Sequence, residues 1–180
     1  EKTTIQDLGG SHIHATITGL ASIVVNNELE AYQQAKSLLV FLSKSEAQYS
    51  KEYDVNTESI FQKYNTYVSC NFDMHDFIYD LIDENSFIEI NKQYAKNVIV
   101  GFAKLNNIKI GIIANQPSIM SGAIDVAASK KMYRFLQVCD AYNVPALFIA
   151  DTPGFLPGKQ EEYSSILGVG ARILSVLANS

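Results

Sequence analysis

The sequence is poor in the features that mark several well-defined classes of protein. It has only two cysteines in 180 residues, Cys70 and Cys139, and they do not form a CxxC pair. This usage fits free thiols in a reducing compartment better than a disulfide scaffold. No run of 18 apolar residues occurs, so no membrane-spanning helix is expected. The opening residues, EKTTIQDLGG, lack both the apolar core of a secretory signal and the arginines of a transit peptide.

Positive charge is scarce as well. Fourteen Lys and Arg residues stand against 19 Asp and Glu residues, which gives a formal net charge of −5. A nucleic-acid-binding surface is therefore not expected. The chain is 47% hydrophobic and 18% charged, which is enough apolar material for one folded domain or for parts of two. Both ends look like positions inside a longer architecture, because the chain opens near a Gly-Gly turn and closes on an apolar-periodic run.

The N-terminal half of the chain predicts few regular elements. Residues 9–25 contain a Gly-Gly turn and then an alternating small and polar stretch. Residues 28–42 have apolar residues at helical spacing and acids in the first turn, which predicts an amphipathic helix. Residues 43–70 are polar without a period and indicate a linker. Asp73 then caps a predicted short helix that ends near Ile82.

Two β-rich runs open the second half, at residues 98–103 and 108–114. Asn106 and Asn107 lie between them. Because asparagine tolerates a positive φ, the two runs predict strands joined by a tight hairpin.

A strand–helix–strand order follows the hairpin. Residues 125–142 carry a helical apolar face that ends before Pro145. The all-apolar run ALFIA (146–150) predicts a strand in a sheet that is covered on both faces. A further helical pattern runs from about Glu162 to Leu177. Since a helix connects two strands, the predicted fold class is α/β with a right-handed crossover.

The loop DTPGFLPG (151–158) comes directly after the predicted strand ALFIA. Loops at the carboxyl ends of strands are where α/β folds bind ligands. Gly154 permits a close backbone approach to a ligand, and Pro153 and Pro157 stiffen the loop on both sides. Backbone N–H groups with few internal partners in such a loop suit an oxyanion.

Two other interpretations of this loop are open at the level of sequence. The first is a plain turn from a strand to a helix. The second is the Asp-x-x-Gly motif of GTPases, which also needs a P-loop to hold the phosphates. Gly158 and Lys159 are followed by Gln160 instead of Ser or Thr, and no other Gly-Lys pair occurs, so a complete nucleotide site is absent.

Residues 94–158 resemble the carboxyltransferase (β) subunits of biotin-dependent acyl-CoA carboxylases of the propionyl-CoA carboxylase type. The resemblance rests on an ordered set of motifs: VGFA, ANQP, SGAIDV, RFLQVCDAYNVP, and DTPGFLPG followed by EEY. LGGSHIHATITGLA also resembles the end of that family's first domain, and FDMHDFIYDLIDENSFIEI resembles the opening of its second.

The resemblance implies a crotonase-like α/β fold, a ββα superhelix. Residues 1–42 would be the end of a first domain, on the acyl-CoA side. Residues 43–70 would be a linker, and residues 71–180 would be the front part of a second domain, on the biotin side.

The resemblance also implies the chemistry. A carboxyl group passes from carboxybiotin, carried on a partner protein, to the α-carbon of a short-chain acyl-CoA such as propionyl-CoA. Backbone N–H groups hold oxyanions on the thioester and on the biotin ureido group, without a metal at this half-site. ATP is used only by the partner biotin carboxylase. A homo-oligomer in bacterial cytoplasm or mitochondrial matrix is implied, with no nucleic acid or membrane as partner.

Specific residues take roles by this resemblance. Gly154 and Phe155 would supply backbone N–H donors toward biotin. The pocket would be shaped by Leu156, Pro157 and Gly158. The acyl-CoA and biotin channel would be lined by Asn115, Gln116, Pro117, Ser121 and Gly122. The acyl-CoA side of the first domain would include Gly9, Gly10, His14, Thr18 and Gly19.

Each of these assignments has a simpler alternative. An ordinary turn explains Asn115-Gln116-Pro117, and a tight bend explains Gly122. His12 and His14 would share one side of an extended segment, which permits a metal, although a His-x-His pair alone is weak support. His75 is expected to be a solvated helix residue. Lys130, Lys131 and Arg134 could reach CoA phosphates, although an exterior charged face of the helix is favoured. Tyr163 fits packing and substrate contact equally well.

The chain departs from the family pattern at several points. Asn106-Asn107 stands where glycine is usual, Glu161 stands where glutamine is common, and the linker is not proline-rich. Two glycine-rich oxyanion motifs of the family would lie before Glu1 and after Ser180. Residues 1–180 alone are therefore not expected to catalyse the reaction. The alternatives to a carboxyltransferase are a non-catalytic fragment or interaction module, or an acyl-CoA decarboxylase with the same sites.

Overall fold

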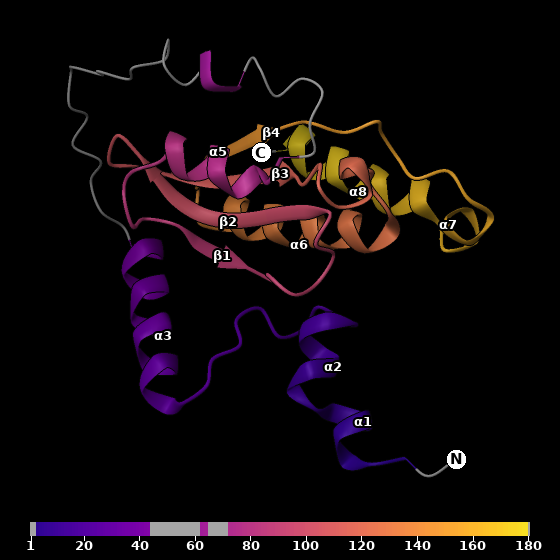
Figure 1. Ribbon diagram of the computed structural model, residues 1–180, viewed down its shortest axis with the longest axis horizontal. Coiled ribbons are helices and arrows are strands. Elements are labelled where there is room, and N and C mark those ends of the chain that lie inside the picture. Colours follow the sequence, from indigo (N-terminus) through magenta and orange to yellow (C-terminus); the bar gives the residue numbers. More distant parts are fainter. Residues whose placement is uncertain (1–2, 44–61, 65–71, 180) are drawn as a thin grey trace.

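A computed structural model describes residues 3–43, 62–64 and 72–179. Its centre is a four-stranded sheet in the order β1-β2-β3-β4 (Figure 1). Strands β1–β2 and β2–β3 pair antiparallel, and β3–β4 pair parallel. The strands are β1 (Ile88–Ile90), β2 (Val98–Leu105), β3 (Ile108–Asn115) and β4 (Ala146–Ile149).

Helices cover the two faces of this sheet (Figure 1). Helix α6 (Val126–Ala141) packs on one face, and α8 (Ile166–Asn179) packs against α6. Helix α5 (Met74–Leu81) packs on the opposite face. Alternate residues of β2 point to the two layers, as a strand requires. Val98, Val100 and Phe102 join the α6 side, whereas Ile99 and Ala103 join the α5 side.

The predicted hairpin is confirmed. Leu105 pairs with Ile108, and Asn106 and Asn107 have φ values of 50° and 64°. Both turn amides donate 2.7 Å hydrogen bonds to the carboxylate of Asp83. Asparagine therefore adopts the positive φ angles that glycine often provides in this kind of turn.

The crossover from β3 through α6 to the parallel strand β4 is also confirmed. The predicted burial of that strand on both faces is wrong within the described residues. Leu147 and Ile149 pack toward α5, but Phe148 is 40% exposed. The reason is that the hydrophobic cluster on the α6 side of the described sheet includes no residue of β4, so this face of the strand has no cover there.

The N-terminal segment is more helical than predicted. It forms α1 (Ile5–Gly9), α2 (Ser11–Thr16) and α3 (Glu28–Leu42). Thr4 and Asp7 form a capping box that starts α1, and Gly10 is the N-cap of α2. His12 and His14 are two positions apart in α2, about 200° around the helix, so the shared side expected of an extended segment is wrong.

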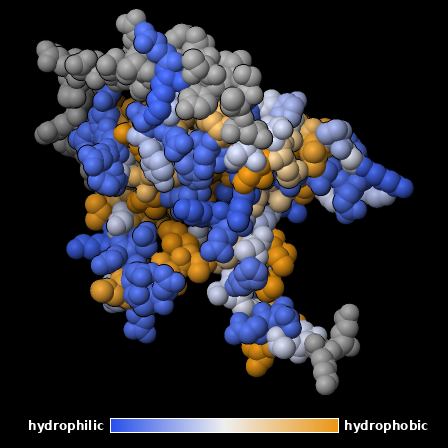
Figure 2. All heavy atoms as spheres, viewed as in Figure 1, coloured by the Kyte–Doolittle hydropathy of each residue, from blue (hydrophilic) through white to orange (hydrophobic). Residues whose placement is uncertain are grey.

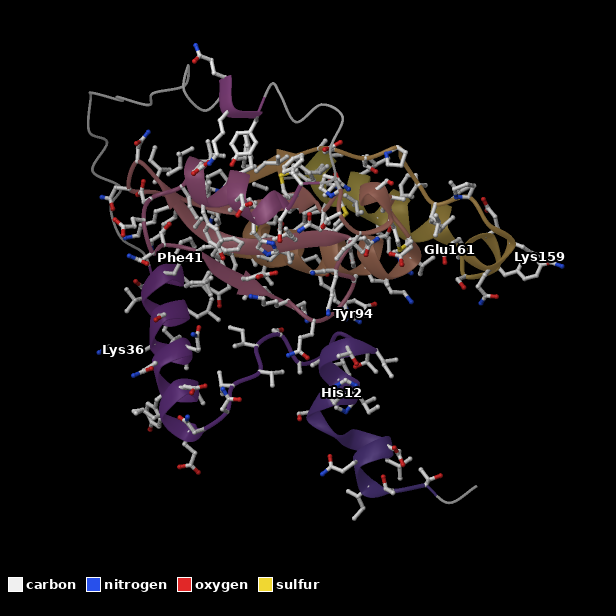
Figure 3. All side chains as sticks on the ribbon, viewed as in Figure 1. His12, Lys36, Phe41, Tyr94, Lys159 and Glu161 are labelled. Carbon is white, nitrogen blue, oxygen red and sulfur yellow. The ribbon has the colours of Figure 1, made fainter. Side chains whose placement is uncertain are left out.

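Helix α3 is confirmed with Asn27 as its N-cap, but most of its apolar face is exposed. Figure 2 shows hydrophobic side chains at the surface over these N-terminal helices. Leu29 and Leu39 are exposed, and only Phe41 is buried. The Phe41 ring lies 5.0 Å from that of Phe102, at the end of α3 that faces the sheet (Figure 3).

The single helix predicted near residues 162–177 is two helices. Helix α7 (Lys159–Tyr163) is separated from α8 at Ser165, which has a φ of 64°. Most of the predicted linker, residues 44–61 and 65–71, lies outside the described residues, as does Cys70, and the division into domains stays a prediction. No helix in the described part is long and apolar enough to cross a membrane.

Candidate functional site

Two backbone segments lie side by side where β3 and β4 end. One is residues 121–126, before α6, and the other is the loop of residues 151–158. Ile124 N–H donates to the carbonyl of Gly154 at 2.9 Å, and Leu156 N–H donates to the carbonyl of Ile124 at 2.8 Å. The parallel order of β3 and β4 brings both segments to the same edge of the sheet, the usual ligand-binding edge of α/β folds.

Gly122 makes this close approach possible. Its φ is 72°, and a Cβ atom there would lie 2.3 Å from the carbonyl oxygen of Asp151. A side chain at this position would push the loop of residues 151–158 away. The tight bend inferred from sequence is therefore also the contact between the two segments.

Buried polar side chains hold the first segment in place. Asn115 Nδ2 donates to the carbonyl of Gly122 at 2.9 Å, and Asn97 Nδ2 donates to that of Ala123 at 2.7 Å. The carboxylate of Glu161 accepts from Val126 N–H at 2.8 Å, which attaches α7 to the start of α6 (Figure 3). The N-terminus of a helix favours such a carboxylate.

The loop holds its two candidate donors differently. Gly154 has a φ of 114°, and its N–H donates to Thr152 Oγ1 at 3.0 Å. The bridge to Ile124 uses Gly154 O and Leu156 N, so Phe155 N–H points away from it and has no acceptor among the described residues. Few internal partners are expected for the N–H groups of this loop, and among the described residues Gly154 N–H has one and Phe155 N–H has none; their role as oxyanion donors stays a prediction. Thr152 was missed, although a threonine two residues before a glycine is a recognisable signal for such a turn.

The rest of the loop leads to α7. The Phe155 ring covers Gly170 of α8, where a Cβ atom would lie 2.9 Å from it. Leu156 is half-buried, whereas Pro157 and Gly158 are exposed. Their assigned part in shaping a pocket stays a prediction. Tyr163 is 75% exposed, so it does not pack within the described residues, and its contact with a substrate stays a prediction.

The ANQP turn supports α5 with its glutamine. Gln116 is buried, its Oε1 accepts from Met74 N–H at 3.0 Å, and its Nε2 donates to Asp73 at 2.6 Å. Pro117 is buried and Ser121 is exposed. The side chain of Gln116 is thus engaged by the first turn of α5, and a role of this turn in a substrate channel stays a prediction.

The structure does not bring the predicted first-domain residues to the loop. Thr18 and Gly19 accept from Arg134 Nη1 at 3.3 Å each, and His14 Nδ1 lies 3.1 Å from Thr18 Oγ1. Arg134 is nine residues past Asp125, which is about 13 Å along the helix. Gly9 and Gly10 come earlier in the chain, at the junction of α1 and α2. The described residues contain no group of three or more His, Cys, Asp or Glu that could hold a metal.

Lys131 corrects one prediction. It is 2% exposed and does not lie on an exterior charged face. Its ammonium donates to the carbonyls of Tyr94, Ala95 and Val98, at 2.8, 3.3 and 2.6 Å. Burial lowers the pKa of Lys131 to about 8, against the opposing charge of Glu89. The lysine fastens the turn before β2 to α6.

His75 corrects a second prediction, because it is not a solvated helix residue. Its side chain is 22% exposed and lines a cavity of about 330 Å³. Nδ1 lies 2.7 Å from Asp73 and Nε2 lies 3.3 Å from Glu89. The hydrogen bond with Glu89 raises the pKa of His75, burial opposes it, and Asp73 adds to the rise.

Replacing His75 with glutamine is expected to make the loss of stability depend on pH. The folded-state pKa lies above the unfolded value of 6.5, so the contribution of His75 is complete below pH 6.5 and fades as pH rises through the folded pKa. Urea unfolding of both proteins from pH 5.5 to 8.5 measures this. The difference should shrink toward high pH, and a difference independent of pH would contradict the ion pairs.

The mixed α/β sheet, with a glycine loop at its strand ends paired to the segment before a helix, has the crotonase-like fold of the solved carboxyltransferase structures that superpose on it. The Carboxyl transferase domain family matches residues 1–180, and the chain belongs to this family. The structure of transcarboxylase 12S, with hydrolyzed methylmalonyl-coenzyme A bound, superposes with a TM-score of 0.87 at 36% identity, over 98% of this chain and 35% of that one.

Curated relatives give the same family. The mitochondrial propionyl-CoA carboxylase beta chain of Sus scrofa is 36% identical over 186 residues, covering 100% of this chain and 34% of that protein. The biotin-dependent acetyl-/propionyl-coenzyme A carboxylase beta5 subunit of Mycobacterium leprae is 34% identical over 187 residues, covering 97% and 34%. The chain therefore spans about a third of the length of these relatives. The resemblance and the crotonase-like fold class are confirmed.

Proposed function

We propose that this chain is part of the carboxyltransferase component of a biotin-dependent acyl-CoA carboxylase. The reaction moves a carboxyl group from carboxybiotin to the α-carbon of a short-chain acyl-CoA such as propionyl-CoA. The observation that carries the proposal is the loop of residues 151–158, which is bonded to Ile124 and leaves Phe155 N–H without an acceptor in the described part of the chain. The names of the relatives support the substrate class.

The loop has the properties that a ureido oxyanion needs. Phe155 N–H is available as a donor, and the position of a Cβ atom on Gly154 has no heavy atom within 4 Å, so a ligand can approach the backbone. Carboxybiotin supplies the carboxyl group when it is bound. The N–H groups of this loop would hold the oxygen on which negative charge develops, and one such donor contributes roughly 3 kcal/mol to transition-state stabilisation.

The partners follow from the same proposal. Biotin would arrive on a carrier protein, and the partner biotin carboxylase would use ATP. Acyl-CoA would bind on the side of the first domain, near Gly9, Gly10, His14, Thr18 and Gly19. The complete protein would be a homo-oligomer of bacterial cytoplasm or mitochondrial matrix. The hexamer described for transcarboxylase 12S supports the oligomer.

A non-catalytic relative with this fold is the second candidate. The observation that favours it is the bond from Gly154 N–H to Thr152, which occupies one of the two assigned donors. An acyl-CoA decarboxylase would share the same sites, and only its products distinguish it.

Transfer from a CoA ester to free biotin tests the proposal. Malonyl-CoA or methylmalonyl-CoA is incubated with biotin and either this chain or the full product of the gene that encodes it. We expect biotin-dependent loss of the CoA ester with the full product only. Because a decarboxylase with the same sites would also pass the carboxyl group to biotin, consumption without dependence on biotin would contradict the proposal. Inertness with every acyl-CoA tried would favour the non-catalytic relative.

A further inference from the structure

We propose that Thr152 sets how many backbone donors the loop of residues 151–158 offers to an oxyanion, an inference that rests on the proposed function. In this structure the loop offers Phe155 N–H, while the hydroxyl of Thr152 occupies Gly154 N–H at 3.0 Å. Thr152 is a positioning residue in this role, because it acts through the backbone of Gly154.

The contacts of the hydroxyl form a closed two-residue turn. A hydroxyl has one donor and two acceptor sites. Thr152 Oγ1 accepts from Gly154 N–H and lies 3.3 Å from Gly154 O, to which it donates. That carbonyl already accepts from Ile124 N–H at 2.9 Å. Thr152 therefore contributes a second, weaker bond there, and its removal leaves the bridge to Ile124 intact.

The occupied donor can be released without moving the backbone. Rotation of the Thr152 side chain breaks both of its bonds, whereas the two bonds between the loop and Ile124 involve only main-chain atoms. The ureido oxygen of biotin is a carbonyl-type acceptor, and the negative charge that develops on it during transfer strengthens it further, so it can replace Thr152 at Gly154 N–H. The exchange costs the bond that Thr152 makes, and this cost reduces affinity for the ligand.

A matched set of variants isolates the hydroxyl. Thr152→Val keeps the branched shape and removes the hydroxyl, Thr152→Ser keeps the hydroxyl, and Thr152→Ala removes it with a smaller side chain. The full gene product labelled uniformly with 15N reports the amides of Gly154, Ile124 and Leu156 by NMR, and titration with biotin gives the affinity. We expect Thr152→Val and Thr152→Ala to bind biotin about three- to tenfold more tightly, the range of one net hydrogen bond, and Thr152→Ser to match the unaltered protein.

The NMR signal separates this inference from the proposed function. An unchanged Gly154 resonance in Thr152→Val would show that the hydroxyl bond is absent and would overturn the inference. Equal or weaker binding of biotin by Thr152→Val, with amide protection of Ile124 and Leu156 retained, would overturn it too. If the Gly154 signal moves only in the variants without a hydroxyl and no protein binds biotin, occupancy of the donor is supported and the biotin assignment fails.

Discussion

Replacing Gly154 with proline is expected to abolish transfer of the carboxyl group from methylmalonyl-CoA to biotin. Gly154 has a φ of 114°, whereas proline fixes φ near −65° and has no N–H. The substitution removes one donor and turns the next peptide, so Phe155 N–H is misdirected as well. Loss of one oxyanion donor lowers kcat by about 10²–10³-fold, and loss of both places activity below detection. The assay is loss of the CoA ester in the presence of biotin by the full gene product.

Gln160→Ala is the control next to the same loop. Gln160 is exposed in the first turn of α7, and alanine favours the helix. This variant should keep full activity. If Gly154→Pro also stays active while its circular dichroism is unchanged, the loop is only a turn between β4 and α7 and the proposed oxyanion role is wrong.

Local sequence signals account for the elements that were predicted correctly. Asn106-Asn107 favours the backbone of a two-residue hairpin, and Asp125 caps α6 by accepting from Ala128 N–H at 2.7 Å. Both interactions lie within a few residues, so their pattern is visible in the chain. The contact of Gly122 with Asp151 follows from the parallel pairing of β3 and β4, which the order of elements also predicts.

The errors have their origin in contacts between distant residues. A lysine within an apolar-periodic helix is normally solvated, but Lys131 meets carbonyls 33 to 37 positions earlier in the chain. His75 likewise faces Glu89 across a separation of 14 residues. The all-apolar composition of β4 predicts burial of both faces of the strand. Burial of the face that carries Phe148 would need an element that packs on it, and none does so among the described residues. Local periodicity contains no information about such partners.

Lys131→Met is expected to destabilise the protein more than the replacement of any exposed polar residue of α6 by an apolar one. Methionine has a similar length and removes the ammonium, which leaves the carbonyls of Tyr94, Ala95 and Val98 without this donor. Each buried carbonyl left without a donor costs about 1–3 kcal/mol. The substitution also removes the desolvation penalty of the ammonium, which offsets part of this cost. We therefore expect the free energy of unfolding to fall by about 3 kcal/mol. Urea denaturation followed by circular dichroism measures the free energy of unfolding.

The pH dependence of that loss identifies its cause. Burial lowers the pKa of Lys131 from 10.5 to about 8. Between these values the unfolded chain binds more protons than the native protein, so stability from this group rises with pH, by on the order of 3 kcal/mol in all. The difference in stability between the unaltered protein and Lys131→Met should therefore grow from pH 7 to pH 10. The neighbouring, exposed Lys130 offers the control, since Lys130→Met should change stability by less than about 0.5 kcal/mol at every pH. Equal effects of the two substitutions, or a difference that does not change with pH, would mean that the ammonium of Lys131 is hydrated and does not fasten the turn before β2.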